Sequence, residues 1–188
     1  MLDSLLFAEG SYGSGFTTKV ISGSNGSLPH HTSGSTRIQN RSATIVDLSA
    51  STECYESDSA RTYLAGERPE ELSRIHREIC EILNTLPRIL LPGTPLVEID
   101  TYVRRELTRI HPVAIQAGNI GHGVGLHAHE YPDICPSCQE VLQDDMVLAI
   151  EPALYLPGCW GIRIENMFHI HSTGSKSMNT LEVSYGNL

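Results

Sequence analysis

Apolar residues along the chain follow two different spacings, and each spacing predicts a different kind of element. Short apolar runs bounded by turn-rich sequence predict strands. These runs are residues 17–22, 43–50, 146–150, 153–155 and 161–171. In the middle of the chain, apolar residues recur at steps of three and four, which predicts helices over residues 69–86 and 94–110. The order of strands, two helices and strands indicates an α+β fold.

Both predicted helices are amphipathic. In the first, Leu72, Ile75 and Ile79 share one face, and the sequence opens on a proline suited to the first helical turn. In the second, Thr94 is the expected N-cap and Pro95 the first helical residue. A helix with one apolar face must bury it, so we expect both helices to cover an antiparallel-leaning sheet.

Length and charge narrow the class of protein. With 188 residues and 40% hydrophobic composition, the chain can bury one sizeable core, so we expect a single domain over residues 1–188. The net charge is −9 and the 13 basic residues form no run, which argues against a nucleic-acid or anionic-membrane partner. No segment has the pattern of a signal peptide or a membrane span, so we expect a cytoplasmic location.

The cysteines do not indicate a disulfide framework, because there are 5 of them and no secretory signal precedes them. Cys135 and Cys138 form a lone CxxC pair among proline, aspartate and serine. A second pair, which a structural zinc site needs, is missing. A surface loop is therefore favoured over a zinc or redox site at this pair.

Residues 121–132, GHGVGLHAHEYP, place His122, His127 and His129 close together in the sequence. This spacing differs from the helical His-Glu-x-x-His metal motif, and the interspersed glycines argue against a helix. We expect a glycine-flanked turn that lets one imidazole approach a ligand. The spacing alone does not say which one.

Carboxylates inside apolar strand segments are the most informative feature of the sequence, because an unpaired buried charge is costly. Each has an ordinary explanation as well: Asp47 and Asp58 can end strands or make turn hydrogen bonds, and Glu165 can pair with the nearby Arg163. Together with a histidine, however, such carboxylates form a hard, oxygen-rich set that suits Mn²⁺, Co²⁺ or Fe²⁺. The candidate set is Asp47, Asp58, His122, Glu151 and Glu165.

The order of these residues, each within its own short motif, resembles the pita-bread metallopeptidases of family M24, which include prolidase, Xaa-Pro aminopeptidase and methionine aminopeptidase. The motifs are IVDL at 45–48, YESDSART at 55–62, GHGVGL at 121–126, IEP at 150–152 and RIE at 163–165. The resemblance runs from about Phe16 to the C-terminus. It implies a curved, antiparallel-leaning sheet backed by helices.

The resemblance also implies a role for each candidate ligand. Asp47 would chelate one ion, and Asp58 and Glu165 would bridge two. His122 and Glu151 would hold the second ion, and Glu151 would also carry protons. The ions would be divalent, Mn²⁺ first, with Co²⁺, Fe²⁺ and Zn²⁺ as alternatives, and a bridging hydroxide would attack the peptide bond.

Other histidines receive roles from the same resemblance. His30 would lie near the substrate, with His31 as an alternative register, and His129 would contact the peptide or its oxyanion. Alternation along a strand would put His127 on the same face as His129, but an exposed, non-functional role is favoured for it. His169 and His171 are interpreted as structural.

The motif Arg163-Ile164-Glu165 resembles the proline-directed branch, in which the arginine would hold the acidic cluster or the end of a small peptide substrate. Hydrolysis of Xaa-Pro bonds is therefore expected. One departure is Gly118, which stands where proline-directed relatives often have a histidine. Methionine aminopeptidase-like or amidohydrolase activity stays open as an alternative.

The other departure is at the N-terminus, where the resemblance implies further helices and a preceding domain. We expect an N-terminally truncated catalytic domain with an incomplete first helical layer. Such a layer would leave apolar surface uncovered, so a homodimer is possible. A catalytically impaired metal-binding or partner-binding fragment is the non-enzymatic alternative.

Overall fold

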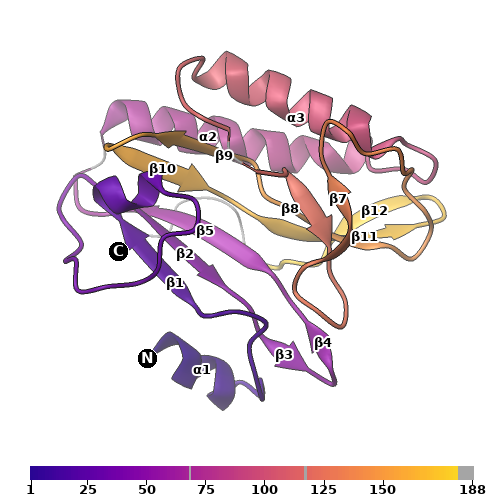
Figure 1. Cartoon of the computed structure of the whole chain (residues 1–188), viewed down its shortest axis with the longest axis horizontal. Helices are drawn as coiled ribbons and strands as arrows, with labels where there is room; N and C mark the ends of the chain where they lie inside the picture. The colour runs from indigo at the N-terminus through magenta and orange to yellow at the C-terminus, as the bar shows by residue number, and fades with distance from the viewer. Residues whose placement is uncertain (68, 117, 182–188) are drawn as a thin grey trace.

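The structure is a computed structural model that describes residues 1–67, 69–116 and 118–181. Helices α2 (Glu70–Thr85) and α3 (Leu96–Ile110) lie side by side over one face of the strands (Figure 1). Every strand pairing in this described part of the chain is antiparallel. The predicted α+β class, with an antiparallel sheet backed by two helices, is confirmed.

The strands form two main sheets and two hairpins. One sheet has three strands in the order β1 (Lys19–Ser22), β2 (Ala43–Leu48) and β5 (Ser59–Leu64). The other has five strands in the order β12 (Gly174–Ser177), β11 (Asn166–His171), β8 (Val147–Ile150), β6 (Gly121–Gly123) and β7 (Glu130–Ile134). The hairpins are β9 (Ala153–Leu156) with β10 (Trp160–Arg163), and β3 (Ser51–Thr52) with β4 (Tyr55–Glu56).

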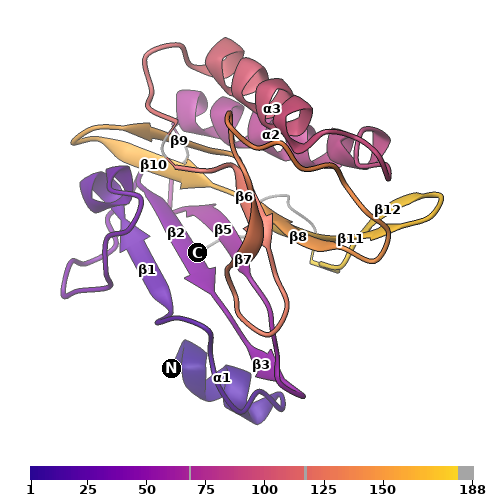
Figure 2. The same ribbon diagram turned by 45° about the vertical axis from the view of Figure 1, so that its right-hand side comes forward.

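Three short helical segments were not expected from the sequence. These are α1 (Leu2–Ala8) and the 3₁₀ turns η1 (Gly23–Ser27) and η2 (Leu86–Arg88). Helix α1 buries none of its residues, and Figures 1 and 2 both place it across the strands from α2 and α3. Helix α1 has only about two turns, which is too short a pattern for periodicity to detect.

Both long helices begin later than predicted, and the assignment of Thr94 as an N-cap is wrong. The residue before each helix is a proline in extended conformation, Pro69 for α2 and Pro95 for α3. Pro95 pairs with Val141 in an isolated β-bridge, and Leu96 N–H donates to the carbonyl of Glu140 at 2.9 Å. This tertiary pairing holds Pro95 extended, so the helix starts at Leu96.

The predicted strand 161–171 is in fact two strands in different sheets, β10 and β11. The break falls at Ile164 and Glu165, where the backbone N–H of Glu165 donates to the carbonyl of Ala60 on β5 at 2.9 Å. At this point the chain crosses from the β9–β10 hairpin to the five-stranded sheet and contacts β5 of the three-stranded sheet on the way. That crossing places Glu165 beside β5.

The hydrophobic core lies between the two long helices and the strands beneath them. Its helical members include Ile75 and Ile79 of α2 and Ile99 and Val103 of α3, and all four are buried. The predicted burial of one apolar face of each helix is confirmed. They pack in one cluster with strand residues such as Ile162. In the part of the chain that the structure describes, no helix is long and apolar enough to cross a membrane.

Candidate metal centre

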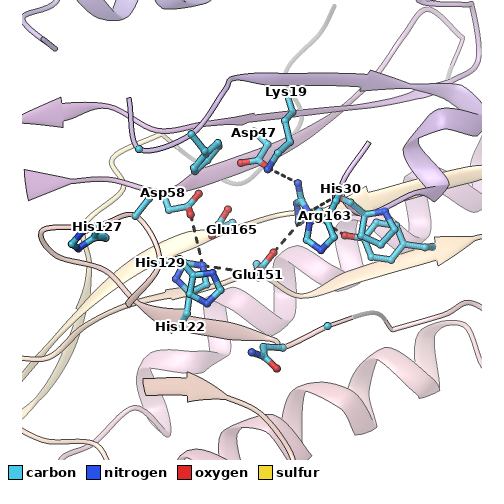
Figure 3. A pocket seen from close by; sticks show the side chains of 17 residues that line it. Lys19, His30, Asp47, Asp58, His122, His127, His129, Glu151, Arg163 and Glu165 are labelled. Carbon is cyan, nitrogen blue, oxygen red and sulfur yellow. Dashed lines mark hydrogen bonds and ion pairs between the residues drawn. The ribbon is translucent and has the colours of Figure 1, made fainter. Parts of the chain in front are cut away.

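A pocket of about 580 Å³ opens where the three-stranded sheet faces the five-stranded sheet. Figure 3 shows acidic and histidine side chains converging on it from both sheets. The pocket is lined by all the carboxylates and histidines for which the family resemblance implied a catalytic, metal or substrate role: His30, Asp47, Asp58, His122, His129, Glu151 and Glu165.

The three-stranded sheet contributes two carboxylates. Asp47 lies within β2 and is 3% exposed, and Asp58 immediately precedes β5 and is 7% exposed. Neither carboxylate is merely a surface strand end, because both side chains point into the pocket beside Glu165 (Figure 3). The ordinary explanation for these residues, strand ends or turn hydrogen bonds, does not account for two buried carboxylates that line one pocket.

His122 lies at the centre of β6, between β7 and β8, so the prediction of a glycine-flanked turn is wrong. Its glycine neighbours are required by close packing of the strands. A Cβ at Gly121 would overlap the carbonyl oxygen of Ala149, and one at Gly123 would lie 2.7 Å from the carbonyl oxygen of Tyr131. The strand turns the buried imidazole toward the pocket (Figure 3).

The remaining two carboxylates are held at strand ends by backbone hydrogen bonds. Glu151 follows β8, and its N–H donates to the carbonyl of Ile120 at 2.8 Å. Glu165 lies at the crossing between β10 and β11 and is 2% exposed. The ordinary explanation for Glu165 was an ion pair with Arg163. The ion pairs of the described residues do not include this one.

Asp58, His122 and Glu165 come together most closely. One ligand atom from each lies within 4.8 Å of the other two, a spacing that could hold a metal ion. His122 Nε2 is 3.7 Å from Asp58 Oδ2 and 3.9 Å from Glu151 Oε1. The set of one imidazole and several carboxylate oxygens suits a hard divalent cation.

The electrostatics of the pocket also fit a cation. Burial, with the charges of Asp47 and Glu151, raises the pKa of Asp58 to about 7. Burial and the neighbouring carboxylates raise the pKa of Glu165 well above its usual value. Among the described residues, no Lys or Arg forms an ion pair with either group, so a divalent ion would supply the missing positive charge. Burial lowers the pKa of His122, which favours the neutral imidazole that binds metals.

Two cationic side chains contact Asp47 instead. Arg163 Nη2 donates a hydrogen bond to Asp47 Oδ2, and Lys19 Nζ lies 3.0 Å from the same oxygen. Arg163 Nη1 also lies 3.9 Å from Glu151 Oε2. Of its two predicted roles, Arg163 therefore shows contact with the acidic cluster, and a contact with substrate stays a prediction.

Lys19 and Arg61 are site residues that the sequence analysis missed. Arg61, 8% exposed, donates to the backbone carbonyls of Ala60 and Glu165 and to Asn166 Oδ1, so it fixes the crossing that carries Glu165. Arg61 lies within the motif at 55–62, and its place there was the sequence feature that could have identified it as a site residue. For Lys19, only the strand register with Asp47 reveals the contact.

The histidines around the pocket differ in their placement. His129 stacks on His122, whereas His127 is highly exposed at the rim, where its backbone N–H donates to Glu130 Oε1 at 2.8 Å. Residues 125–129 form bends, so strand alternation does not relate these two histidines as predicted. His30 lines the pocket, whereas its register alternative, His31, is not among the lining residues. The structural interpretation of His169 and His171 fits their place on β11.

Two further features concern the rim and the surface. Gly118 lines the pocket at a φ of +72°, and a Cβ there would meet no atom within 4 Å. Cys135 and Cys138 lie in a turn directly after β7, and both are free thiols. The surface-loop interpretation of the CxxC pair agrees with this placement.

The model of metallopeptidase family M24 matches residues 1–172. The chain belongs to this family. A curated Xaa-Pro dipeptidase of Pyrococcus horikoshii is 32% identical over 167 residues, which cover 89% of this chain and 48% of that protein. The chain thus spans about half the length of the curated relatives it matches.

Solved structures show the same fold. An X-Pro aminopeptidase from Thermotoga maritima superposes with a TM-score of 0.93 at 28% identity, covering 100% of this chain and 53% of that one. A prolidase from Pyrococcus furiosus has a TM-score of 0.90 at 31% identity, covering 96% and 54%. The predicted pita-bread fold is confirmed, and membership of a metallopeptidase family implies divalent metal ions.

Proposed function

We propose that this chain acts as a metal-dependent peptidase that hydrolyses Xaa-Pro bonds, as an Xaa-Pro aminopeptidase or dipeptidase, with two divalent ions, Mn²⁺ first. The observation that carries the proposal is the convergence of Asp58, His122 and Glu165, with Asp47 and Glu151 lining the same pocket. These side chains come from distant strands of a chain that belongs to family M24.

Each side chain has a proposed task. Asp47 would hold one ion, Asp58 and Glu165 would lie between two, and His122 with Glu151 would hold the other. When bound, such ions lower the pKa of water toward neutrality and polarise a carbonyl. Asp58 and Glu165, whose pKa values are raised in the metal-free pocket, would give up their protons on loading.

Glu151 is suited to proton transfer. Burial raises its pKa, the neighbouring Arg163 opposes that rise, and the side chain is 23% exposed toward the pocket. In its ionised form, the Glu151 carboxylate would accept a proton at Oε1 from the attacking water and pass it to the leaving nitrogen. His129 and His30 line the pocket and would contact the substrate carbonyl or backbone.

The Xaa-Pro preference is supported by the Arg163-Ile164-Glu165 motif and by the prolidases and X-Pro aminopeptidase that the chain resembles. A pocket of about 580 Å³ is also in the range that suits a small ligand such as a short peptide. A small peptide is therefore the proposed substrate.

The proposal is tested with Mn²⁺-loaded protein and a panel of Xaa-Pro dipeptides, Xaa-Pro tripeptides, Met-Ala and small amides. We expect release of proline or of a proline-led product, and loss of it in Glu151→Gln and His122→Ala. His127→Ala, at the exposed rim, is the matched control and should remain active.

Other results point elsewhere. Preference for Met-Ala would indicate a methionine aminopeptidase-like activity, and hydrolysis of the small amides alone an amidohydrolase. A rise in melting temperature with Mn²⁺ and no hydrolysis would indicate a binding module. Protein that retains no metal after purification with Mn²⁺ would refute the metal centre.

A further inference from the structure

Lys19 lies directly opposite Asp47 on neighbouring antiparallel strands. The register of β1 and β2 pairs these two residues, so their side chains project from the same face of the sheet. Lys19 Nζ contacts Asp47 Oδ2 at 3.0 Å, and the lysine side chain is 22% exposed. The strand pairing, rather than a chance rotamer, thus brings the ammonium to the carboxylate.

Two further contacts hold the ammonium at this place. Lys19 Nζ lies 4.4 Å from the centroid of the Phe16 ring, a cation–π contact. Arg163 Nη2 bonds to the same oxygen of Asp47. Figure 3 shows Lys19 and Arg163 approaching Asp47 together, on the side of the pocket away from His122. An ion that binds Asp47 Oδ2 would therefore compete with both Lys19 and Arg163 for this oxygen.

The opposite end of the pocket has a different charge balance. Asp58, His122 and Glu165 converge within 4.8 Å, and the ion pairs of the described residues include no Lys or Arg contact with Asp58 or Glu165. A cation entering the pocket meets uncompensated carboxyl groups here. At Asp47 it meets a carboxylate already paired with two cations.

We propose that Lys19 competes with a divalent ion for Asp47, so that the ion at Asp47 binds more weakly than the ion at His122. This inference rests on the proposed pair of ions and adds to it a residue that sets the affinity of one of them. Lys19 opposes filling of the Asp47 end, because its ammonium and the ion compete for the same carboxylate oxygen. Lys19 is thus a determinant of how many ions the pocket holds at a given metal concentration.

The test is equilibrium dialysis of metal-stripped protein against graded free Mn²⁺, followed by metal analysis. Wild-type protein should bind ions in two separate steps. Lys19→Met removes the charge and keeps the length of the side chain, and it should bind the second ion on the order of tenfold more tightly, because a unit charge beside a buried ligand changes cation affinity by at least that order. The affinity of Lys19→Met for the first ion should change little.

Three comparisons make the test specific. Lys19→Arg keeps the charge and should keep the weak second step, and Lys19→Gln should behave as Lys19→Met does. The chain's other lysine, Lys176, lies exposed on β12, and Lys176→Met should match wild type. Thermal unfolding checks that each variant is folded.

Failure of this inference differs from failure of the proposed function. Two equal steps in wild type, or an unchanged second step in both neutral variants, would overturn the role of Lys19 and leave the metal centre standing. A wild-type protein that binds no Mn²⁺ at any concentration would refute the metal centre itself.

Discussion

The imidazole of His129 stacks on that of His122, with ring centroids 3.9 Å apart and ring planes inclined by 21°. Nε2 of His129 lies 3.0 Å from Oδ1 of Asp133, which is on β7. The hydrogen bond from His129 lowers the pKa of Asp133, which keeps this carboxylate ionised as the partner of the ring. Asp133, on β7, therefore orients His129, which lines the pocket. The neighbouring strand β6 carries the candidate metal ligand His122.

Replacing this partner should impair turnover without removing the metal. In Asp133→Asn the charged acceptor is lost, so the His129 ring is less well oriented and kcat should fall on the order of tenfold, as is typical for groups that orient site residues. Mn²⁺ content should stay at the wild-type level. Steady-state kinetics on an Xaa-Pro dipeptide with parallel metal analysis checks this.

A second His–Asp pair provides the control. His169 Nε2 lies 3.3 Å from Asp145 Oδ1, and both residues are outside the pocket lining. Asp145→Asn should leave kcat unchanged. Equal losses in the two variants would mean that Asp133 contributes to general stability rather than to the orientation of His129.

The glycines around His122 should be intolerant of any side chain. In Gly123→Ala the new methyl would lie 2.7 Å from the backbone oxygen of Tyr131, which cannot move without shifting β7. We expect a loss of about 1–3 kcal/mol in the free energy of unfolding, as for other overpacked sites. Urea denaturation of metal-free protein measures it.

Gly34→Ala is the matched substitution, because a Cβ at Gly34 would meet no atom within 4 Å. It should change the free energy of unfolding by less than about 0.5 kcal/mol. A Gly123→Ala variant as stable as Gly34→Ala would contradict the close approach of β6 and β7.

The sequence predicts the helices better than the strands, for a physical reason. Faces such as Ile75 with Ile79 repeat at the helical period within one element, so the pattern is local. Strand β12 (Gly174–Ser177) contains no large apolar residue and exists because β11 pairs with it. Such pairing depends on distant sequence, and the same is true of the crossing at Glu165.

The candidate site shows the same division. The acidic residues were predictable because a carboxylate such as Asp47 within an apolar strand is costly unless it has a partner. The partners themselves were not predictable. Lys19 meets Asp47 only through the register of β1 and β2, and Arg61 meets Glu165 only where the chain crosses between sheets.

Arg61 should be important for stability because it fixes that crossing. Its buried guanidinium donates to Asn166 Oδ1 at 2.8 Å and to the backbone oxygens of Ala60 and Glu165. Arg61→Met leaves these acceptors without their donor, and we expect a loss of about 3 kcal/mol in the free energy of unfolding. Mn²⁺ affinity should weaken as well, since Glu165 loses its fixed position.

The comparison variant for Arg61 is Arg41→Met, which removes an exposed ion pair with Glu67. Exposed pairs contribute little, so the loss there should be under about 1 kcal/mol. If urea denaturation gives the two variants equal stability, Arg61 does not hold the crossing.

The metal-free protein should lose stability as the pH rises from about 4 to about 7, in contrast to the usual behaviour of ion-paired carboxylates. Burial and like charges raise the pKa of Asp58 from 3.8 to about 7 in the folded state. The folded form therefore holds this proton more tightly than the unfolded chain does. Below pH 4, Asp58 is protonated in both the folded and the unfolded state, so it does not change the free energy of unfolding. Above pH 7 it is ionised in both states, and its buried charge lowers the free energy of unfolding by about 4 kcal/mol.

Urea denaturation of metal-stripped protein at pH 5 and pH 8 measures this slope, with Asp58→Asn as the comparison, because its side chain has a similar shape and no charge. Without metal at pH 8, Asp58→Asn should be more stable than wild type. Addition of Mn²⁺ should reverse the order, because the ion stabilises the ionised carboxylate and gains little from the amide. If the free energy of unfolding changes with pH in the same way in both proteins, Asp58 is not the group whose buried charge destabilises the metal-free protein.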